Sequence, residues 1–199
     1  MNRLVVFQVF MVLVAYAYGA DIHPLPTALE YRLDVKIDYS TNKLYGTCEI
    51  TFHNESDQPI PLVPLLLYRQ LALTAAADGD QRALPYTQNI VRISGWEQIQ
   101  VNFIEIALEE ALMPGHQGTI EVEYEGYMFG YSADGWRYVK DHIDRNFTMV
   151  RTDGYGYPVI AYPSEKDMMP AQVRHDYSIR VTVPDGLTVV TGGKLLEQV

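Results

Sequence analysis

Apolar and polar residues alternate along several short stretches of this chain, and the alternation predicts β-strands. In residues 31–38 every second residue is apolar, and the residues between them are charged. Successive side chains of an extended chain point to opposite faces, so one face of this stretch is expected in a core and the other in water. Residues 40–43 have the composition of a turn, and the alternation resumes in residues 44–53. The two stretches predict an antiparallel hairpin.

Further stretches complete the prediction of an all-β fold. Residues 60–77 are mostly apolar, but Pro61 and Pro64 exclude a long helix and favour one or two buried strands. Residues 104–111 are ambiguous between a strand and a helical face. The other predicted strands are 87–94, 98–108, 118–125, 177–183 and 187–191. About eight to ten short strands separated by Gly, Pro, Asn and Asp predict an antiparallel β-sandwich or open barrel.

Between residues 126 and 163 the pattern is different, because aromatic residues lie close to glycines. Flat rings stack on sugars and peptides, and glycine allows a close approach, so this segment could line a binding groove. It could equally form a satellite core under long loops. We expect Trp136 to pack and Tyr155 and Tyr157 to be more exposed. Asp153, Tyr155 and Tyr157 are therefore the predicted substrate-binding residues.

The first twenty residues predict a signal peptide. Arg3 precedes an apolar run that ends in small residues, and the run is short for a membrane span, which favours a cleaved leader over an anchor. The remaining residues, 21–199, have the length of a single domain with one core. We therefore expect an exported protein that is extracellular, periplasmic or at the cell surface.

Charge and cysteine content narrow the choice of partners and of stabilising bonds. The net charge of −10 argues against nucleic acid and against anionic membrane surfaces as partners. Cys48 is the only cysteine, so no disulfide forms within the chain and stability must come from the hydrophobic core. We expect Cys48 to be a small buried residue on a strand.

Several of these stretches together resemble the N-terminal domain of the M1 family of zinc aminopeptidases. Their order and spacing are similar to those of the family across most of residues 29–193. The stretches that carry the resemblance are residues 31–35, 46–52, 120–126 and 177–186. The resemblance implies a β-rich domain that precedes a thermolysin-like catalytic domain.

The family's substrate-binding segment, T-Q-x-E-x-x-x-A-R-x-x-F-P, is not reproduced. Alignment on Tyr162 and Pro163 places Thr152 at the Gln, Gly154 at the Glu and Val159 at the Arg. In the family, the Gln and Glu help to hold the free amino group of the substrate. The resemblance thus assigns no residue to that task, and it implies either a divergent M1-like branch or a likeness of fold alone.

The sequence encodes no recognisable catalytic motif. A zinc peptidase needs two histidines one helical turn apart with a glutamate between them, and no H-E-x-x-H is present. His142, with Asp144 two residues on, has too few partners for a metal site. Nucleophile elbows and phosphate-binding glycine loops are also missing from the sequence. We predict no catalytic residue, metal ligand or cofactor in this chain, and zinc only in a catalytic domain outside it.

Three functions remain open. The first is a non-catalytic N-terminal domain of an exported M1 aminopeptidase-like protein, which supports or walls a peptide-binding cleft and has the protein's C-terminal domains as partners. The second is a stand-alone exported β-sandwich module that binds a glycan or peptide. The third is an extracytoplasmic domain of a membrane complex. The chain ends in an apolar segment without a polar tail, which favours a fragment of a longer protein.

Overall fold

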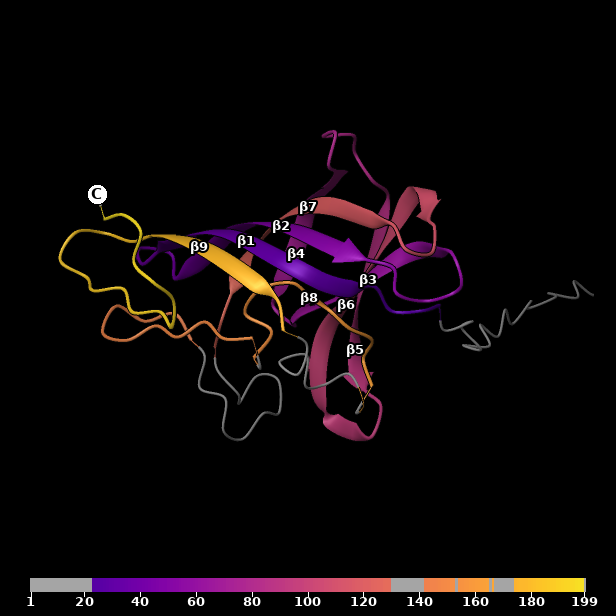
Figure 1. The fold of residues 1–199 in the computed structure, drawn as a ribbon. Helices are drawn as coiled ribbons and strands as arrows, with labels where there is room; N and C mark the ends of the chain where they lie inside the picture. The colour runs from indigo at the N-terminus through magenta and orange to yellow at the C-terminus, as the bar shows by residue number, and fades with distance from the viewer. Residues whose placement is uncertain (1–22, 130–141, 153, 165, 167–173, 199) are drawn as a thin grey trace, which may run out of the picture.

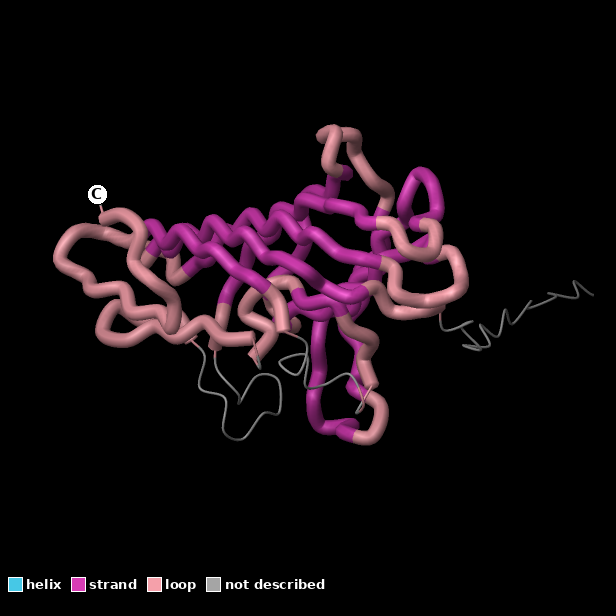
Figure 2. Tube along the Cα trace, viewed as in Figure 1, coloured by secondary structure: helices cyan, strands magenta, loops and turns pink. Residues whose placement is uncertain are grey.

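The computed structural model describes residues 23–129, 142–152, 154–164, 166 and 174–198. These residues form nine strands and connecting loops (Figures 1 and 2). The strands are β1 (Thr27–Asp38), β2 (Lys43–His53), β3 (Ile60–Tyr68), β4 (Leu71–Asp78), β5 (Tyr86–Ile93), β6 (Trp96–Leu112), β7 (Gln117–Tyr127), β8 (Val159–Ile160) and β9 (Asp176–Thr182). No helix that could span a membrane occurs in the described part of the chain. The all-β prediction is confirmed.

Five strands form a first sheet, sheet A, in the order β4-β7-β2-β1-β9. The hairpin predicted for residues 31–53 is its centre: β1 and β2 are antiparallel, with Val35 opposite Gly46. Alternation explains the arrangement, because each strand turns its apolar residues to one side and its charged residues to water. The one exception to antiparallel pairing in this sheet is β9, which runs parallel to β1.

The other four strands form sheet B, in the order β5-β6-β3-β8. The hairpin of β5 and β6 extends away from sheet A (Figure 1). Residues 104–111, ambiguous in the sequence, belong to β6, and Ile104 and Ile106 are fully buried. Proline has no N–H to donate, so the two prolines of β3 need positions where no pairing strand requires one. Pro61 lies at a register irregularity in the pairing with β6, and Pro64 precedes Leu65 and Leu66, the only β3 residues that pair with β8.

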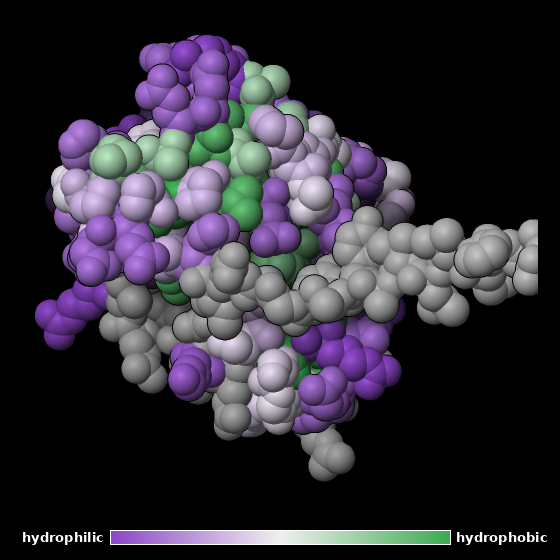
Figure 3. All heavy atoms as spheres, turned by 90° about the vertical axis from the view of Figure 1, so that its right-hand side faces the viewer, coloured by the Kyte–Doolittle hydropathy of each residue, from purple (hydrophilic) through white to green (hydrophobic). Residues whose placement is uncertain are grey.

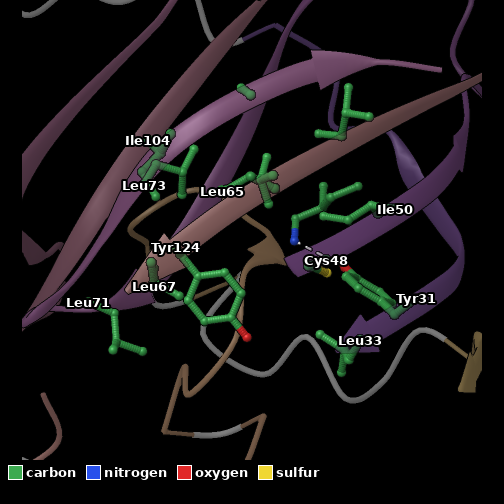
Figure 4. Packing of buried hydrophobic residues seen from close by; sticks show 14 of the residues in the cluster. Tyr31, Leu33, Cys48, Ile50, Leu65, Leu67, Leu71, Leu73, Ile104 and Tyr124 are labelled. Carbon is green, nitrogen blue, oxygen red and sulfur yellow. Dashed lines mark hydrogen bonds between the residues drawn. The ribbon is translucent and has the colours of Figure 1, made fainter. Parts of the chain in front are cut away.

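The two sheets pack face to face and enclose the main core (Figure 4). Cys48 lies in this core beside Tyr31 and Tyr124, and its side chain is fully buried. Burial raises the pKa of the Cys48 thiol, so the sulfur stays protonated and unreactive. The prediction of a small buried residue on a strand is confirmed.

A smaller cluster covers the opposite face of sheet B. Along β3, Leu65 and Leu67 belong to the main core, whereas Leu66 belongs to this second cluster. Tyr155 and Val159, from the aromatic segment, pack against it. Sheet B is therefore buried on both faces where β3 runs through it, which accounts for the continuous apolar run in that strand.

The outer edge of β4 is closed by polar side chains of sheet B. Gln88 accepts a hydrogen bond from the Leu73 N–H at 3.0 Å and donates one to the Leu73 carbonyl at 3.1 Å. Asn102 donates to the Leu71 carbonyl at 2.9 Å and to the Gln88 amide oxygen at 3.0 Å. These amides occupy the position of a neighbouring strand, so the two sheets are joined at this edge.

One predicted strand is absent from the structure, and two predictions fall outside it. Residues 187–191 form no strand; the chain turns at Gly186, where φ is +82°, and Val190 is 88% exposed. This stretch has no neighbouring strand to pair with among the described residues. The signal peptide and Trp136 lie outside the described residues.

Candidate functional site

A small pocket lies where the start of β1 meets the segment around Tyr157 and the residue before β9. Its volume is about 100 Å³ and it is partly enclosed. Its apolar wall consists of Leu25, Pro26, Ala28, Val159 and Ile160. Its aromatic and polar groups come from Thr27, Tyr31, Thr152, Tyr157 and His175. We call it the Tyr31 pocket.

Tyr31 is the fixed base of this pocket. Its hydroxyl oxygen accepts a hydrogen bond from the Ile160 N–H at 3.2 Å. Its ring meets His175 edge to face with centroids 4.8 Å apart, and meets Tyr157 in the same way at 6.1 Å. Burial raises the pKa of the Tyr31 phenol above its usual range, although the backbone hydrogen bond acts in the opposite direction. The phenol is therefore neutral over the physiological range.

Tyr157 is the one predicted binding residue that the structure places at the pocket. Its hydroxyl and the Thr152 hydroxyl are in close hydrogen-bond contact. The Thr152 side chain also lines the pocket. Asp153, the third predicted binding residue, lies outside the described residues.

The expectation that Tyr155 is exposed is wrong. Its side chain is 1% exposed and packs in the second cluster under sheet B. The backbone explains the difference: Tyr155 has a φ of 54°, and its N–H donates to the Thr152 carbonyl at 2.9 Å. This turn directs the ring toward sheet B, and the Tyr155 carbonyl accepts a hydrogen bond from the Tyr68 N–H at 2.7 Å.

Sequence reasoning did not identify the rest of the pocket. Tyr31 appears in the sequence as an ordinary strand residue, Ala28 precedes the predicted strand, and His175 is one of five histidines without a motif. They come together because β9 pairs in parallel with β1, with Tyr31 opposite Tyr177. A parallel pairing between distant segments leaves no local pattern, so no signal in the sequence indicated these residues.

A second surface feature lies in the aromatic segment and its flanks. Tyr127, Phe129 and Phe147, which we call the aromatic patch, are 40%, 58% and 54% exposed. The rings of Tyr127 and Phe129 are nearly parallel, with centroids 5.8 Å apart. Phe129 forms an isolated bridge with His142, whose ring is 6.1 Å from that of Phe147. The patch is thus one connected group of rings that face solvent.

The outer face of sheet A is a solvated, charged surface. A shallow depression of about 220 Å³ lies there, lined in part by Lys36, Glu123 and Glu125. Lys43 forms an ion pair with Glu125 at 2.7 Å, so the charges on this face are partly neutralised. Another side of the molecule also carries hydrophobic residues only among hydrophilic ones (Figure 3). Hydrophobic residues scattered among polar ones are common on protein surfaces, so neither surface marks a site.

The described residues contain no group of three His, Cys, Asp or Glu side chains that could hold a metal ion. His142 lies beside the aromatic rings of the patch. The chemistry available at the Tyr31 pocket is therefore contact with apolar groups and hydrogen bonding through hydroxyls and one imidazole.

Comparisons with known proteins find similarity only among solved structures. No family model matches the chain, and no curated protein matches it. An M1 zinc metallopeptidase from Deinococcus radiodurans is 18% identical, with 52% of this chain and 21% of that chain covered and a TM-score of 0.41. Leukotriene A4 hydrolase from Saccharomyces cerevisiae is 10% identical, with 51% and 15% covered and a TM-score of 0.40.

A two-domain M1 zinc metallopeptidase bound to L-tryptophan is 20% identical, with 52% of this chain and 21% of that chain covered and a TM-score of 0.41. The chain spans about a fifth or less of the length of these proteins. At this level the likeness concerns the arrangement of strands over half of the chain, and it identifies no site.

Proposed function

We propose that this chain is a non-catalytic β-domain of an exported M1 aminopeptidase-like protein, in which it supports and partly walls a peptide-binding cleft. The observation that carries the proposal is the position of the Tyr31 pocket beside β9, the end strand of sheet A among the described residues. His175 lines the pocket and directly precedes Asp176, the first residue of β9. Tyr177 of β9 lies next to Tyr31 in the sheet and is 47% exposed.

The edge of β9 is suited to contact with another structural unit. Among the described strands β9 pairs only with β1, and its residues are exposed or half-buried. By contrast, the edge of β4 is closed by Gln88 and Asn102. A unit packed against β9 would have the Tyr31 pocket at its boundary, where a small, partly enclosed pocket forms one wall of a larger cleft.

The sequence resemblance supports the same reading and limits it. The stretches that carry it form β1, β2, β7 and β9, which are four of the five strands of sheet A. Thr152 and Gly154 stand at the positions that would hold the amino group of a substrate, and neither side chain is an acid or an amide. The proposed role is therefore a wall of the cleft, with zinc and the catalytic residues in C-terminal domains.

The gene provides the direct test. We expect the reading frame to continue past Val199 into an H-E-x-x-H segment, and we expect aminopeptidase activity only in the longer protein. Activity is measured with aminoacyl reporter substrates on this chain and on the complete product. A reading frame that stops shortly after Val199, with no peptidase domain encoded beside it, would refute the proposal.

A second candidate function, a module that binds a glycan or peptide, is favoured by the aromatic patch. Three exposed rings on one surface offer flat apolar faces to a sugar or to a proline-rich peptide. The test is a glycan and peptide array probed with the chain and with Phe129→Ala. Leu195→Ala, at a residue 71% exposed outside the patch, is the control. Signals that do not change in Phe129→Ala would exclude the patch as the binding surface.

A further inference from the structure

We infer that the Tyr31 pocket binds the neutral aliphatic side chain of a peptide residue, of the size of valine or leucine. The inference rests on the proposed function for the peptide nature of the ligand. The size and polarity of the preferred side chain follow from the pocket itself.

The volume of the pocket limits the size of the group it accepts. An apolar cavity of about 150 Å³ in a protein core accommodates benzene. The Tyr31 pocket, at about 100 Å³, is smaller, so a branched aliphatic group matches it more closely than a phenyl or indole ring. Glycine and alanine side chains would leave the apolar wall partly unfilled.

The lining excludes charged groups. None of the described lining residues is an Asp, Glu, Lys or Arg. A charged side chain that entered would lose its hydration without gaining an ion pair to a carboxylate, lysine or arginine of the lining, and such a transfer is unfavourable. The Tyr31 hydroxyl already accepts the Ile160 N–H, and the Thr152 and Tyr157 hydroxyls bond each other. The apolar wall of Leu25, Pro26, Ala28, Val159 and Ile160 is the larger part of the lining, so the pocket favours an apolar group.

The pocket is also held in place before any ligand arrives. Tyr31 lies within β1, which pairs with β2 on one side and with β9 on the other. Ile160 belongs to β8 and is tied to Tyr31 by the hydrogen bond between them. A preformed wall loses little conformational freedom on binding. Because the contact is small, we expect dissociation constants in the millimolar range for a single residue.

The test is a titration of the chain with blocked amino acids, followed by amide NMR signals. The probes are the N-acetyl methylamides of leucine, valine, glycine, aspartate, lysine and phenylalanine. We expect leucine and valine to shift the signals of Tyr31, Tyr157 and Ile160, and to bind about tenfold or more tightly than the other four. Equal binding of all probes, or shifts confined to other parts of the molecule, would overturn the inference.

Two variants and one control locate the binding. Ala28→Leu fills the pocket and is expected to abolish the shifts, whereas Ala72→Leu, on the exposed face of β4, is expected to leave them unchanged. Leu25→Ser removes apolar wall from a segment outside the strands and is expected to weaken binding several-fold. Leu25→Ser is the alternative test if the Ala28→Leu variant does not fold. Leucine binding that neither variant weakens would show that the site lies elsewhere.

The inference about the pocket and the proposed function can fail independently of each other. Binding of the leucine probe, together with a gene that encodes no peptidase domain, would support the inference about the pocket and refute the M1-like role. Absence of binding together with a downstream H-E-x-x-H would do the reverse.

Discussion

The ring of Tyr124 lies directly over Gly46 on the neighbouring strand of sheet A. The two residues are opposite each other in the β2–β7 pairing. A β-carbon added to Gly46 would stand 2.6 Å from the Tyr124 hydroxyl oxygen and closer still to the ring. The space that a side chain of β2 would occupy is therefore filled by an aromatic ring from β7, a cross-strand arrangement that compensates for a glycine in a strand.

We expect Gly46→Ala to destabilise the protein, because the added methyl group cannot coexist with the ring in its present position. Overpacking a core typically lowers the free energy of unfolding by about 1 to 3 kcal/mol. Urea unfolding of the variant and of the parent chain measures this loss. In the double variant Gly46→Ala/Tyr124→Leu the clash is removed, so the two changes together should cost less than the sum of their separate effects. Simple additivity would contradict the proposed contact.

Removing the hydroxyl of Tyr31 and removing that of Tyr124 should have different effects on stability, although both phenols are buried. The Tyr31 hydroxyl accepts the Ile160 N–H, whereas the Tyr124 hydroxyl is buried without a hydrogen-bond partner among the described residues. Tyr31→Phe leaves the Ile160 N–H unsatisfied and should cost about 1 to 3 kcal/mol. Tyr124→Phe removes an unsatisfied group and should be neutral or stabilising. Urea unfolding of both variants at neutral pH checks the difference, and a large loss in Tyr124→Phe would contradict it.

The same two tyrosines predict sensitivity to alkaline pH. Burial raises the pKa of both phenols above the ordinary value of 10.0, and the folded state therefore retains protons that the unfolded state releases. Their contribution to stability is complete below about pH 10 and is lost as the pH rises toward the folded-state pKa. We expect the melting temperature to fall above about pH 10, less steeply in Tyr124→Phe than in the parent chain. Identical slopes would show that the Tyr124 phenol does not contribute.

The closure of the β4 edge can be tested at Asn102. Asn102→Leu removes the donor to the Leu71 carbonyl and to the Gln88 amide, and should cost about 1 to 3 kcal/mol. Asn89→Leu, at an exposed position of β5, is the control and should change the stability by less than about 0.5 kcal/mol. Because an open edge pairs with other chains, light scattering at rising protein concentration should show association only in Asn102→Leu.

Truncation of Tyr155 tests the finding that its ring is a core residue. Tyr155→Ala should cost about 3 to 5 kcal/mol, as the removal of buried aromatic side chains does. Tyr127→Ala, at a half-exposed ring, should leave the melting temperature nearly unchanged. Equal effects of the two substitutions would contradict the burial of Tyr155.

The strands could be predicted from the sequence because their period of two is a local property. The hairpin of β1 and β2 needs only alternation and a turn, and both are visible within residues 31–53. The parallel partner of β1 was not predictable, since no local pattern links Tyr31 with Tyr177. Residues 187–191 show the converse: the pattern of a strand is present, but no neighbouring strand pairs with it among the described residues.

The candidate site was predicted only in part, for a related reason. Tyr157 was selected because aromatic residues near glycines often line grooves, and it does reach the pocket. The same rule failed for Tyr155, because a turn with positive φ decides which way its ring points. His175 is brought to the pocket by the docking of β9, and the sequence around it does not indicate that position.

The pairing of β9 with β1 has a consequence for the order in which the chain is assembled. Asp34 of β1 and Arg180 of β9, which bond at 3.4 Å, are 146 positions apart in the sequence. Closing so long a loop costs more entropy than closing the short turn between β1 and β2. While the chain is being synthesised, the hairpin of β1 and β2 can form early. The other edge of β1 stays unpaired until β9 has been synthesised, which is after most of the described residues. During that interval the bare edge is a site where two nascent chains could pair wrongly.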